Sequence, residues 1–166
     1  MKERPGDLPY LYLRPGEVHF SRTPAVVGTI LGSCLAATFY SRRLAAGAIC
    51  HALLPGGEGR TGCRYVDYAI SYMLDEFARI GVPPHELDAK LFGGADMFGP
   101  VAKSSGRATV GRQNIVAARA ALSREGVTVS RSHLGGNLGR KIYFYPHIGD
   151  VLLKRIERTA MPEGVR

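Results

Sequence analysis

The chain has 166 residues, of which 45% are hydrophobic and 22% are charged, and its formal net charge at pH 7 is +8. This composition excludes a globally disordered chain, and no apolar run approaches the ~20 residues of a membrane span. The length suits one domain over residues 1–166, and the start lacks the apolar stretch of a signal peptide, so we expect a cytoplasmic protein without membrane insertion.

The first third of the chain predicts short strands after an irregular start. Residues 1–16 hold three prolines and several charges, which favours an irregular lead-in. The glycine-rich stretch 56–63 predicts an exposed, flexible loop. Between these two segments, apolar and β-prone runs predict strands at 18–20, 26–31, 35–40 and within 44–53.

Two helices are predicted from apolar residues at three- and four-residue spacing. The first spans 65–80 and ends at Gly81, and the second is centred on 115–122 and ends at Gly126. Residues 111–114 open the second helix, and their unpaired amides face whatever lies before it. In the first helix we interpret four residues as ordinary packing rather than a cofactor box, namely Tyr65, Tyr68, Tyr72 and Met73.

The last third of the chain is rich in predicted strands. A polar loop is expected at 99–106 and a frayed tail at 158–166. The strands fall at 87–92, 127–130, 141–145 and 151–156, with the last two forming a hairpin. The alternation of strands with two helices indicates an α/β layered domain.

The three cysteines are predicted to be reduced. Their odd number and the absence of a CxxC spacing argue against a disulfide framework and against a structural zinc site. Strand alternation places Cys50 and His51 on opposite faces, so we interpret Cys50 as a core residue. Cys63 lies in the glycine-rich loop, and we expect it to be exposed. A metal site built from Cys34, Cys50, His51 and Cys63 stays an alternative.

Cys34 and His51 form the most informative pair in the chain. Cys34 follows the turn Gly32-Ser33, and His51 ends an apolar run seventeen residues later. Imidazole is the usual base that activates a thiol, and the amides of a glycine turn are able to bind an oxyanion. With Thr29 near enough in sequence to orient the imidazole, the pattern favours acyl transfer from an amide or ester. The simpler alternative is that Cys34 is a small buried hydrophobe.

The same segment carries a family resemblance. Residues 29–34 read TILGSC, and Gly47, His51 and Leu54-Pro55 follow them. Further landmarks occur in order at Lys90 to Ala95 with Met97, Gly111 to Asn114, Gly135 to Asn137, and Gly139-Arg140. Over about residues 15–156, the chain resembles the chemoreceptor glutamine deamidases of the CheD family.

The resemblance implies a chemotaxis enzyme that converts particular glutamines of methyl-accepting receptors to glutamate. It implies that Cys34 is the nucleophile, that His51 is the general base, and that Thr29 orients the histidine. Ser33 matches a supporting position beside the nucleophile. These roles are expectations carried over from the family.

The resemblance also implies a fold and a set of partners. The expected fold is a layered sandwich of mixed β-sheets with two main helices, similar to cytotoxic necrotizing factor-type cysteine deamidases. The expected partners are the receptor cytoplasmic domain, as protein substrate, and a CheC-type phosphatase. No metal and no organic cofactor are implied.

Two positions depart from the family pattern, and two other functions stay open. His133 stands before Gly135 where an acidic residue is common, and Cys50 directly before His51 is unusual. Neither departure removes a catalytic group. The chain is alternatively a binding module that docks a CheC-type phosphatase or a receptor, or a nucleic-acid-binding protein driven by charge. The basic residues are dispersed, so nucleic acid is the least favoured partner.

Overall fold

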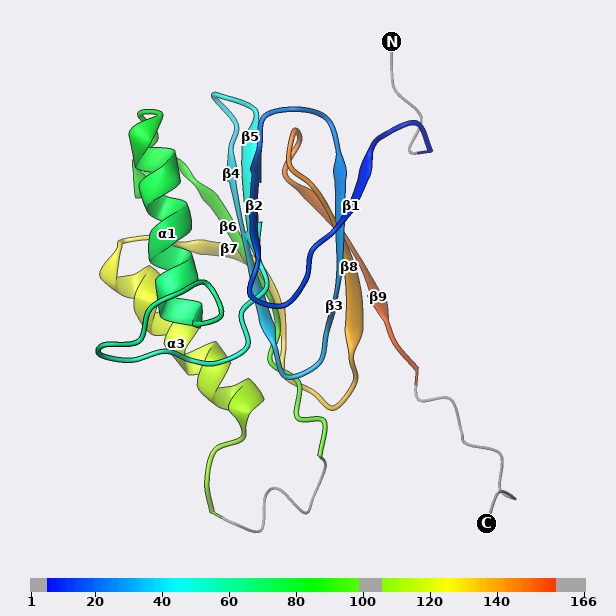
Figure 1. The fold of residues 1–166 in the computed structure, drawn as a ribbon, viewed down its shortest axis with the longest axis vertical. Helices are drawn as coiled ribbons and strands as arrows, with labels where there is room; N and C mark the ends of the chain where they lie inside the picture. Colours follow the sequence, from blue (N-terminus) through cyan, green and yellow to red (C-terminus); the bar gives the residue numbers. More distant parts are fainter. Residues whose placement is uncertain (1–5, 99–105, 158–166) are drawn as a thin grey trace.

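The computed structural model describes residues 6–98 and 106–157, which form three layers (Figure 1). The first layer holds the helices α1 (Val66–Arg79) and α3 (Val110–Arg124). A five-stranded sheet lies in the middle and a four-stranded sheet covers its other face. Each sheet contains parallel and antiparallel pairs. The predicted α/β sandwich of mixed sheets with two main helices is therefore confirmed.

The five-stranded sheet is the central layer. Its strand order is β2-β5-β4-β6-β7, and only the last pair is parallel. Strands β4 and β5 are buried almost throughout, because helices cover one face and the second sheet covers the other. In this order the strands span Val18–Ser21, Ala46–Cys50, Leu35–Ser41, Asp88–Gly93 and Val129–Leu134.

The four-stranded sheet has the order β1-β3-β8-β9. Its strands span Tyr10–Tyr12, Val26–Leu31, Arg140–Tyr145 and Asp150–Arg155. The prediction of an irregular lead-in over 1–16 is wrong at β1, which pairs in parallel with β3. All three β1 side chains are exposed, so this edge strand is joined through its backbone and leaves no apolar alternation in the sequence.

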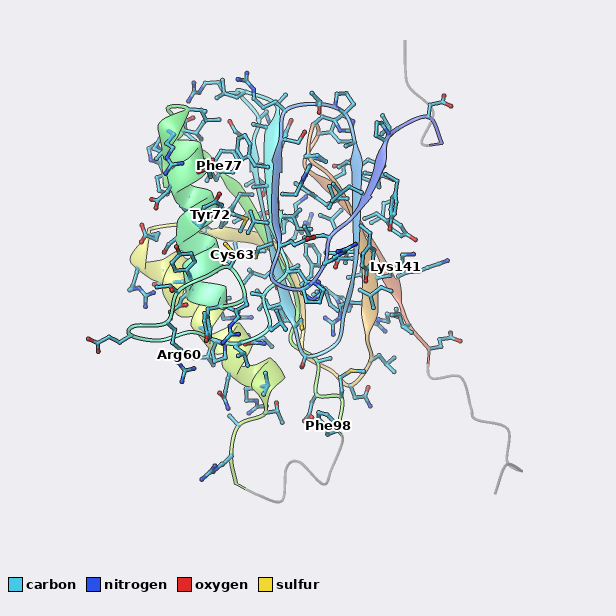
Figure 2. The ribbon with its side chains drawn as sticks, in the orientation of Figure 1. Arg60, Cys63, Tyr72, Phe77, Phe98 and Lys141 are labelled. Carbon is cyan, nitrogen blue, oxygen red and sulfur yellow. The ribbon has the colours of Figure 1, made fainter. Side chains whose placement is uncertain are left out.

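Two apolar cores hold the layers together. The core between the helices and the central sheet includes Phe39, Met73 and Phe77. The core between the two sheets is smaller and includes Leu31 and Phe144. Figure 2 labels Phe77 and Tyr72, which mark the buried and exposed sides of α1.

The sheets approach closely at Gly47 on β5. A Cβ atom there would lie 2.5 Å from the carbonyl oxygen of Pro146, in the turn between β8 and β9. Because that contact is with backbone, the turn has no side chain to move aside. A glycine at this position therefore lets the β8–β9 hairpin pack onto the central sheet.

Apart from β1, most predicted elements lie where the sequence places them, with three further differences. Tyr68 and Tyr72 are 39% and 42% exposed, so the packing interpretation is correct only for Tyr65 and Met73. Strand β7 starts two residues later than predicted and runs to Leu134, because its exposed polar residues hide the pattern. A short 3-10 helix, Pro84–Glu86, was not predicted.

Two further features bear on the predictions. The expected loop at 99–106, except for Gly106, and the expected tail at 158–166 lie outside the described residues. No helix in the described part of the chain is both long and apolar enough to cross a membrane.

Candidate active site

Cys34 lies in the turn between β3 and β4 and is partly exposed. Its carbonyl oxygen accepts a hydrogen bond from the Gly94 amide at 2.9 Å, and the Gly32 carbonyl accepts one from Ala95 at 2.9 Å. Gly93 has a φ of +108°, and a Cβ there would lie 2.2 Å from the Cys34 carbonyl oxygen. The segment after β6 therefore holds the Cys34 turn, and its close approach requires glycine.

His51 follows β5 and lies on the same face of the sheet as Cys34. Leu35 and Ala52 exchange two backbone hydrogen bonds, of 2.9 and 2.8 Å, and both belong to the helix-side core. Side chains alternate along each strand, so the flanking residues Cys34 and His51 both point to the sheet–sheet interface. They occupy diagonal positions of an antiparallel pair, about 7–8 Å apart or less, within reach of an imidazole.

Thr29 contacts His51 from the opposite sheet. It lies on the inner face of β3, is fully buried, and its Oγ1 is 2.7 Å from His51 Nδ1. The same Oγ1 donates to the carbonyl oxygen of Leu13 at 2.8 Å. A hydroxyl has one proton and the carbonyl only accepts, so His51 Nδ1 must be the donor to Thr29. The lone pair of the neutral imidazole is then on Nε2, which is the form that a general base needs.

The lead-in also positions the histidine. The Gly16 amide donates to the His51 carbonyl at 2.7 Å, and the His51 amide donates to the Glu17 carbonyl at 3.1 Å. Together with the Leu13 carbonyl, this segment fixes both the backbone of His51 and the hydroxyl of Thr29. Residues just before β2 are therefore part of the site.

Burial makes both reactive groups neutral at rest. It lowers the pKa of His51 to about 4, and the imidazole is therefore uncharged at neutral pH. Burial also raises the pKa of the Cys34 thiol, against a smaller lowering by a hydrogen bond from its own backbone. The resting pair is accordingly a thiol and an imidazole rather than a thiolate and an imidazolium.

Asn114 is a site residue whose role was not predicted from the sequence. It is fully buried in the first turns of α3, and its Nδ2 donates to the carbonyls of Ser33 and Leu53 at 2.9 and 3.0 Å. One carbonyl directly precedes Cys34 and the other lies two residues after His51. Asn114 therefore joins the two strand ends that carry the reactive pair. The sequence signal was its place at the end of the family landmark Gly111 to Asn114, which opens the predicted helix.

A cavity of about 510 Å³ opens beside Cys34. One wall is the start of α3, including Thr109 and Gly111, and Thr109 Oγ1 accepts the Arg112 amide there as the helix cap. Other walls are apolar and include Phe98, which is 82% exposed and is labelled in Figure 2. A helix N-terminus concentrates unpaired amides and partial positive charge, so this cavity suits a developing oxyanion.

The remaining predicted positions divide between the two faces of the central sheet. Ser33 lines the cavity, while its carbonyl accepts from Asn114. Cys50 is fully buried in the helix-side core, and Cys63 is only partly exposed beside that core. Burial raises the pKa of Cys50 to about 12, which makes this thiol unreactive.

The alternative of a metal site is not supported in the described part of the chain. No three His, Cys, Asp or Glu side chains within residues 6–98 and 106–157 are placed to hold one ion. Cys50 faces the helices, whereas Cys34 and His51 face the other sheet.

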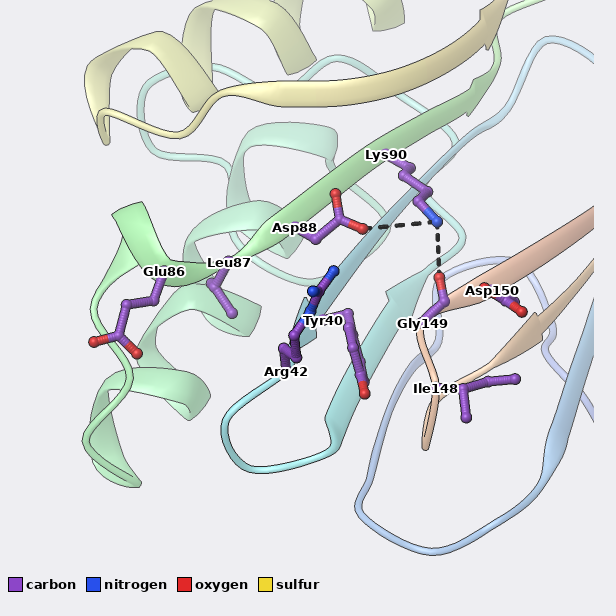
Figure 3. A pocket seen from close by; sticks show the side chains of 9 residues that line it. All are labelled: Tyr40, Arg42, Glu86, Leu87, Asp88, Lys90, Ile148, Gly149 and Asp150. Carbon is purple, nitrogen blue, oxygen red and sulfur yellow. Dashed lines mark hydrogen bonds and ion pairs between the residues drawn. The ribbon is translucent and has the colours of Figure 1, made fainter.

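Another hollow lies at the other end of the central sheet (Figure 3). It measures about 620 Å³ and is lined by Tyr40 and Arg42, at the far end of β4 from Cys34. Its Lys90 donates to the Gly149 carbonyl at 2.8 Å and lies 3.7 Å from the Asp88 carboxylate. This polar hollow is separate from the reactive pair.

The fold and the site together define a class of protein. A buried histidine held by a hydroxyl, on the same face as a cysteine beside a cavity, is compatible with cysteine-dependent acyl transfer. The family model for CheD chemotactic sensory transduction matches residues 53–155. The chain belongs to the CheD family.

Full-length relatives agree with this assignment. A probable chemoreceptor glutamine deamidase CheD 2 of Geobacter sulfurreducens is 47% identical over 159 residues, covering 96% of this chain and 98% of that protein. A probable chemoreceptor glutamine deamidase CheD of Nitratidesulfovibrio vulgaris is 40% identical, covering 94% of this chain and 82% of that protein. The first alignment is long enough to include the whole segment from Thr29 to His51.

Solved structures give a more distant likeness. The hypothetical protein YfiH of Bacillus licheniformis is 13% identical, with a TM-score of 0.47 over 72% of this chain and 49% of that chain. The Neisseria meningitidis protein NMB0706 is 20% identical, with a TM-score of 0.47 over 80% of this chain and 64% of that chain. Family membership rests on the sequence relatives.

The neutral resting pair predicts a broad pH profile. The pKa of His51 lies near 4 and that of Cys34 is raised, so kcat/KM should stay level from about pH 5 to pH 9 and fall below about pH 4 as the imidazole gains a proton. Initial rates across this range test it, with circular dichroism at each pH as the control for unfolding. An acid limb at about pH 6 would instead indicate that the imidazole keeps its ordinary pKa. A resting thiolate–imidazolium pair would be recognised by a fall in rate on the alkaline side, as the imidazolium loses its proton.

Removing the Asn114 amide should loosen the reactive pair. Asn114→Ala leaves two half-buried carbonyls without their donor, at a cost of about 1 kcal/mol each, and should also lower kcat/KM about tenfold. The matched control is Gln113→Ala, which removes one exposed hydrogen bond, to Ala108, from the same helix turn. Urea unfolding and turnover are measured on both. Equal stability and turnover in the two variants would contradict the role of Asn114.

Proposed function

We propose that this chain is a protein-glutamine deamidase, or protein-glutamine glutaminase, that acts on chemoreceptors. Its reaction converts glutamine side chains of methyl-accepting receptors to glutamate through a thioester on Cys34. Membership of the CheD family and the printed names of its relatives support this reaction. The observation that carries it is the hydrogen bond from His51 to Thr29, which leaves Nε2 free on the face that Cys34 shares.

The first half of the reaction forms the thioester. The Cys34 sulfur attacks the carboxamide carbon as His51 Nε2 takes the thiol proton, which turns a neutral pair into a nucleophile and an imidazolium. The tetrahedral oxyanion forms beside the start of α3, whose positive end lines the cavity. The imidazolium then gives its proton to the leaving nitrogen, the C–N bond breaks, and ammonia departs.

The second half hydrolyses the thioester. Water loses a proton to His51 Nε2 and attacks the thioester carbon, the C–S bond breaks, and the proton returns to the Cys34 sulfur. Glutamate and the resting neutral pair are the products. Throughout both halves Thr29 accepts from Nδ1–H, so the ring keeps one orientation. These steps need no metal and no organic cofactor, and the same groups would serve a receptor methyl ester.

Partners and location follow from this reaction. The substrate is the cytoplasmic domain of a receptor, so the enzyme works in the cytoplasm. A CheC-type phosphatase as a second partner is supported by the family resemblance alone. Ser33, at the cavity wall and bonded through its carbonyl to Asn114, supports the nucleophile rather than reacting itself.

Deamidation is tested directly by mass. Purified receptor cytoplasmic fragment incubated with the protein should gain roughly 1 Da per modified glutamine, with release of the ammonia that leaves in acyl transfer. Cys34→Ala should abolish the gain, and Cys63→Ala is the matched control that retains it. A fragment whose mass does not change with wild-type protein would refute the deamidase, and a gain that survives Cys34→Ala would refute the nucleophile.

Thr29 is tested through the hydroxyl it supplies. Thr29→Val keeps the shape but removes the acceptor for His51 Nδ1–H, so kcat should fall roughly tenfold or more while KM stays similar. Thr29→Ser keeps the hydroxyl and should restore most of the rate. If both variants turn over like wild type, another group orients the imidazole; if both lose activity equally, Thr29 acts through packing.

A further inference from the structure

A second pocket, rich in positive charge, lies next to the segment after β6 that holds the Cys34 turn. Its volume is about 230 Å³. Its walls come from the end of β7, the loop that follows, and the edge strands β8 and β9. The charged and titratable residues that line it are His133, Arg140 and Arg155, and we call it the cationic pocket.

The charge in this pocket is not compensated. Arg140 is 2% exposed, and its guanidinium donates to the carbonyls of His133 and Gly135. Its Nε is buried without a partner, and in the described part of the chain no carboxylate forms an ion pair with Arg140 or Arg155. Backbone carbonyls solvate the guanidinium without neutralising it. A buried cation of this kind favours an anion in the adjoining space.

The groups facing the pocket agree with an anionic occupant. Arg155 is exposed, and its Nη2 lies 3.4 Å from His133 Nε2, while Arg140 Nη1 lies 3.0 Å from His133 Nδ1. Two cations therefore flank one imidazole. Burial, and then these two cations, lower the pKa of His133. A bound carboxylate would reverse the effect of the cations.

The cationic pocket is joined to the Cys34 turn through the segment after β6. The Gly135 amide donates to the Gly93 carbonyl at 2.9 Å, and the Asp96 amide donates to the Gly136 carbonyl at 2.8 Å. Gly93 in turn pairs with Leu35, the residue after Cys34. Neighbouring strands lie about 4.8 Å apart, so the pocket loop is roughly 10 Å from the nucleophile. The Asp96 carboxylate belongs to the cavity at Cys34 and not to this pocket.

We propose that the cationic pocket binds a carboxylate side chain of the protein substrate while the target glutamine occupies the cavity at Cys34. The proposal rests on the proposed deamidase function for the identity of the substrate. A substrate segment that crosses this end of the sandwich meets both sites. An acidic residue near the target glutamine is thereby a recognition element, read by Arg155 with Arg140 behind it.

The test measures equilibrium binding to the Cys34→Ala protein, so that no turnover is required. Two peptides carry one central glutamine and differ at the positions three, four and seven residues to either side, which are glutamate in one and serine in the other. The glutamate peptide should bind about tenfold more tightly, the effect of one charge-assisted contact, and its advantage should shrink with added salt. The ring protons of His133 should shift with the glutamate peptide only.

A matched pair of variants assigns the effect to the pocket. In the Cys34→Ala background, Arg155→Gln should remove the preference for glutamate. Arg42→Gln removes the same charge from an exposed arginine at the polar hollow at the opposite end of β4, and should retain the preference. If Arg42→Gln also removed the preference for glutamate, the preference would reflect only the overall charge of the protein. The assignment to the cationic pocket would then be wrong.

Other outcomes also decide the matter. Equal binding of the two peptides, or a preference that survives Arg155→Gln, overturns the proposal. The preference for the glutamate peptide is also measured with added millimolar phosphate or acetate. If phosphate abolishes it and acetate does not, the pocket is a phosphate site and the proposal of a carboxylate ligand is wrong. A glutamate preference lost with Arg155→Gln supports the pocket even if the wild-type protein deamidates no receptor, a result that would refute the proposed function alone.

Discussion

The site depends on one hydroxyl proton. Thr29 donates this proton to the Leu13 carbonyl, so the hydroxyl can only accept from His51. His51 therefore donates from Nδ1 and carries its lone pair on Nε2. The hydroxyl belongs to the four-stranded sheet and the imidazole to the end of a strand in the five-stranded sheet. In the proposed mechanism, His51 acquires the tautomer of a general base only when the two sheets are packed, so the small core between them would serve catalysis as well as stability.

Side-chain alternation along the strands explains how much of the site could be predicted from the sequence. Alternation alone separates Cys50 from His51, and the structure places Cys50 in the helix-side core as expected. The same rule places Cys34 and His51 on one face once Leu35 pairs with Ala52. That pairing is a tertiary contact, so the sequence pattern alone does not predict its register. Local pattern thus indicates the candidate residues, while long-range pairing decides which of them share a face.

The parts that the sequence did not predict share a physical cause. Strand β1 is an exposed edge held by backbone hydrogen bonds, and backbone bonds leave no side-chain signature. Asn114 acts through two carbonyls that lie 81 and 61 residues away in the chain, so nothing near it in sequence indicates its partners. Polar groups that satisfy distant backbone atoms can be recognised only after the fold is known.

The electrostatics of the two sites are opposite, and this difference has a use. At the Cys34 cavity, burial favours the neutral thiol and the neutral imidazole. In the proposed reaction, charge therefore appears only when the thiol attacks a carboxamide. Beside it, Arg140 is a permanent buried charge that no titration near neutral pH removes. A fixed cation attracts and orients an acidic protein segment without activating the thiol. In the proposed mechanism, recognition and activation are separated by about two strand spacings. A basic protein can then hold an acidic substrate while its nucleophile stays protonated until the target glutamine arrives.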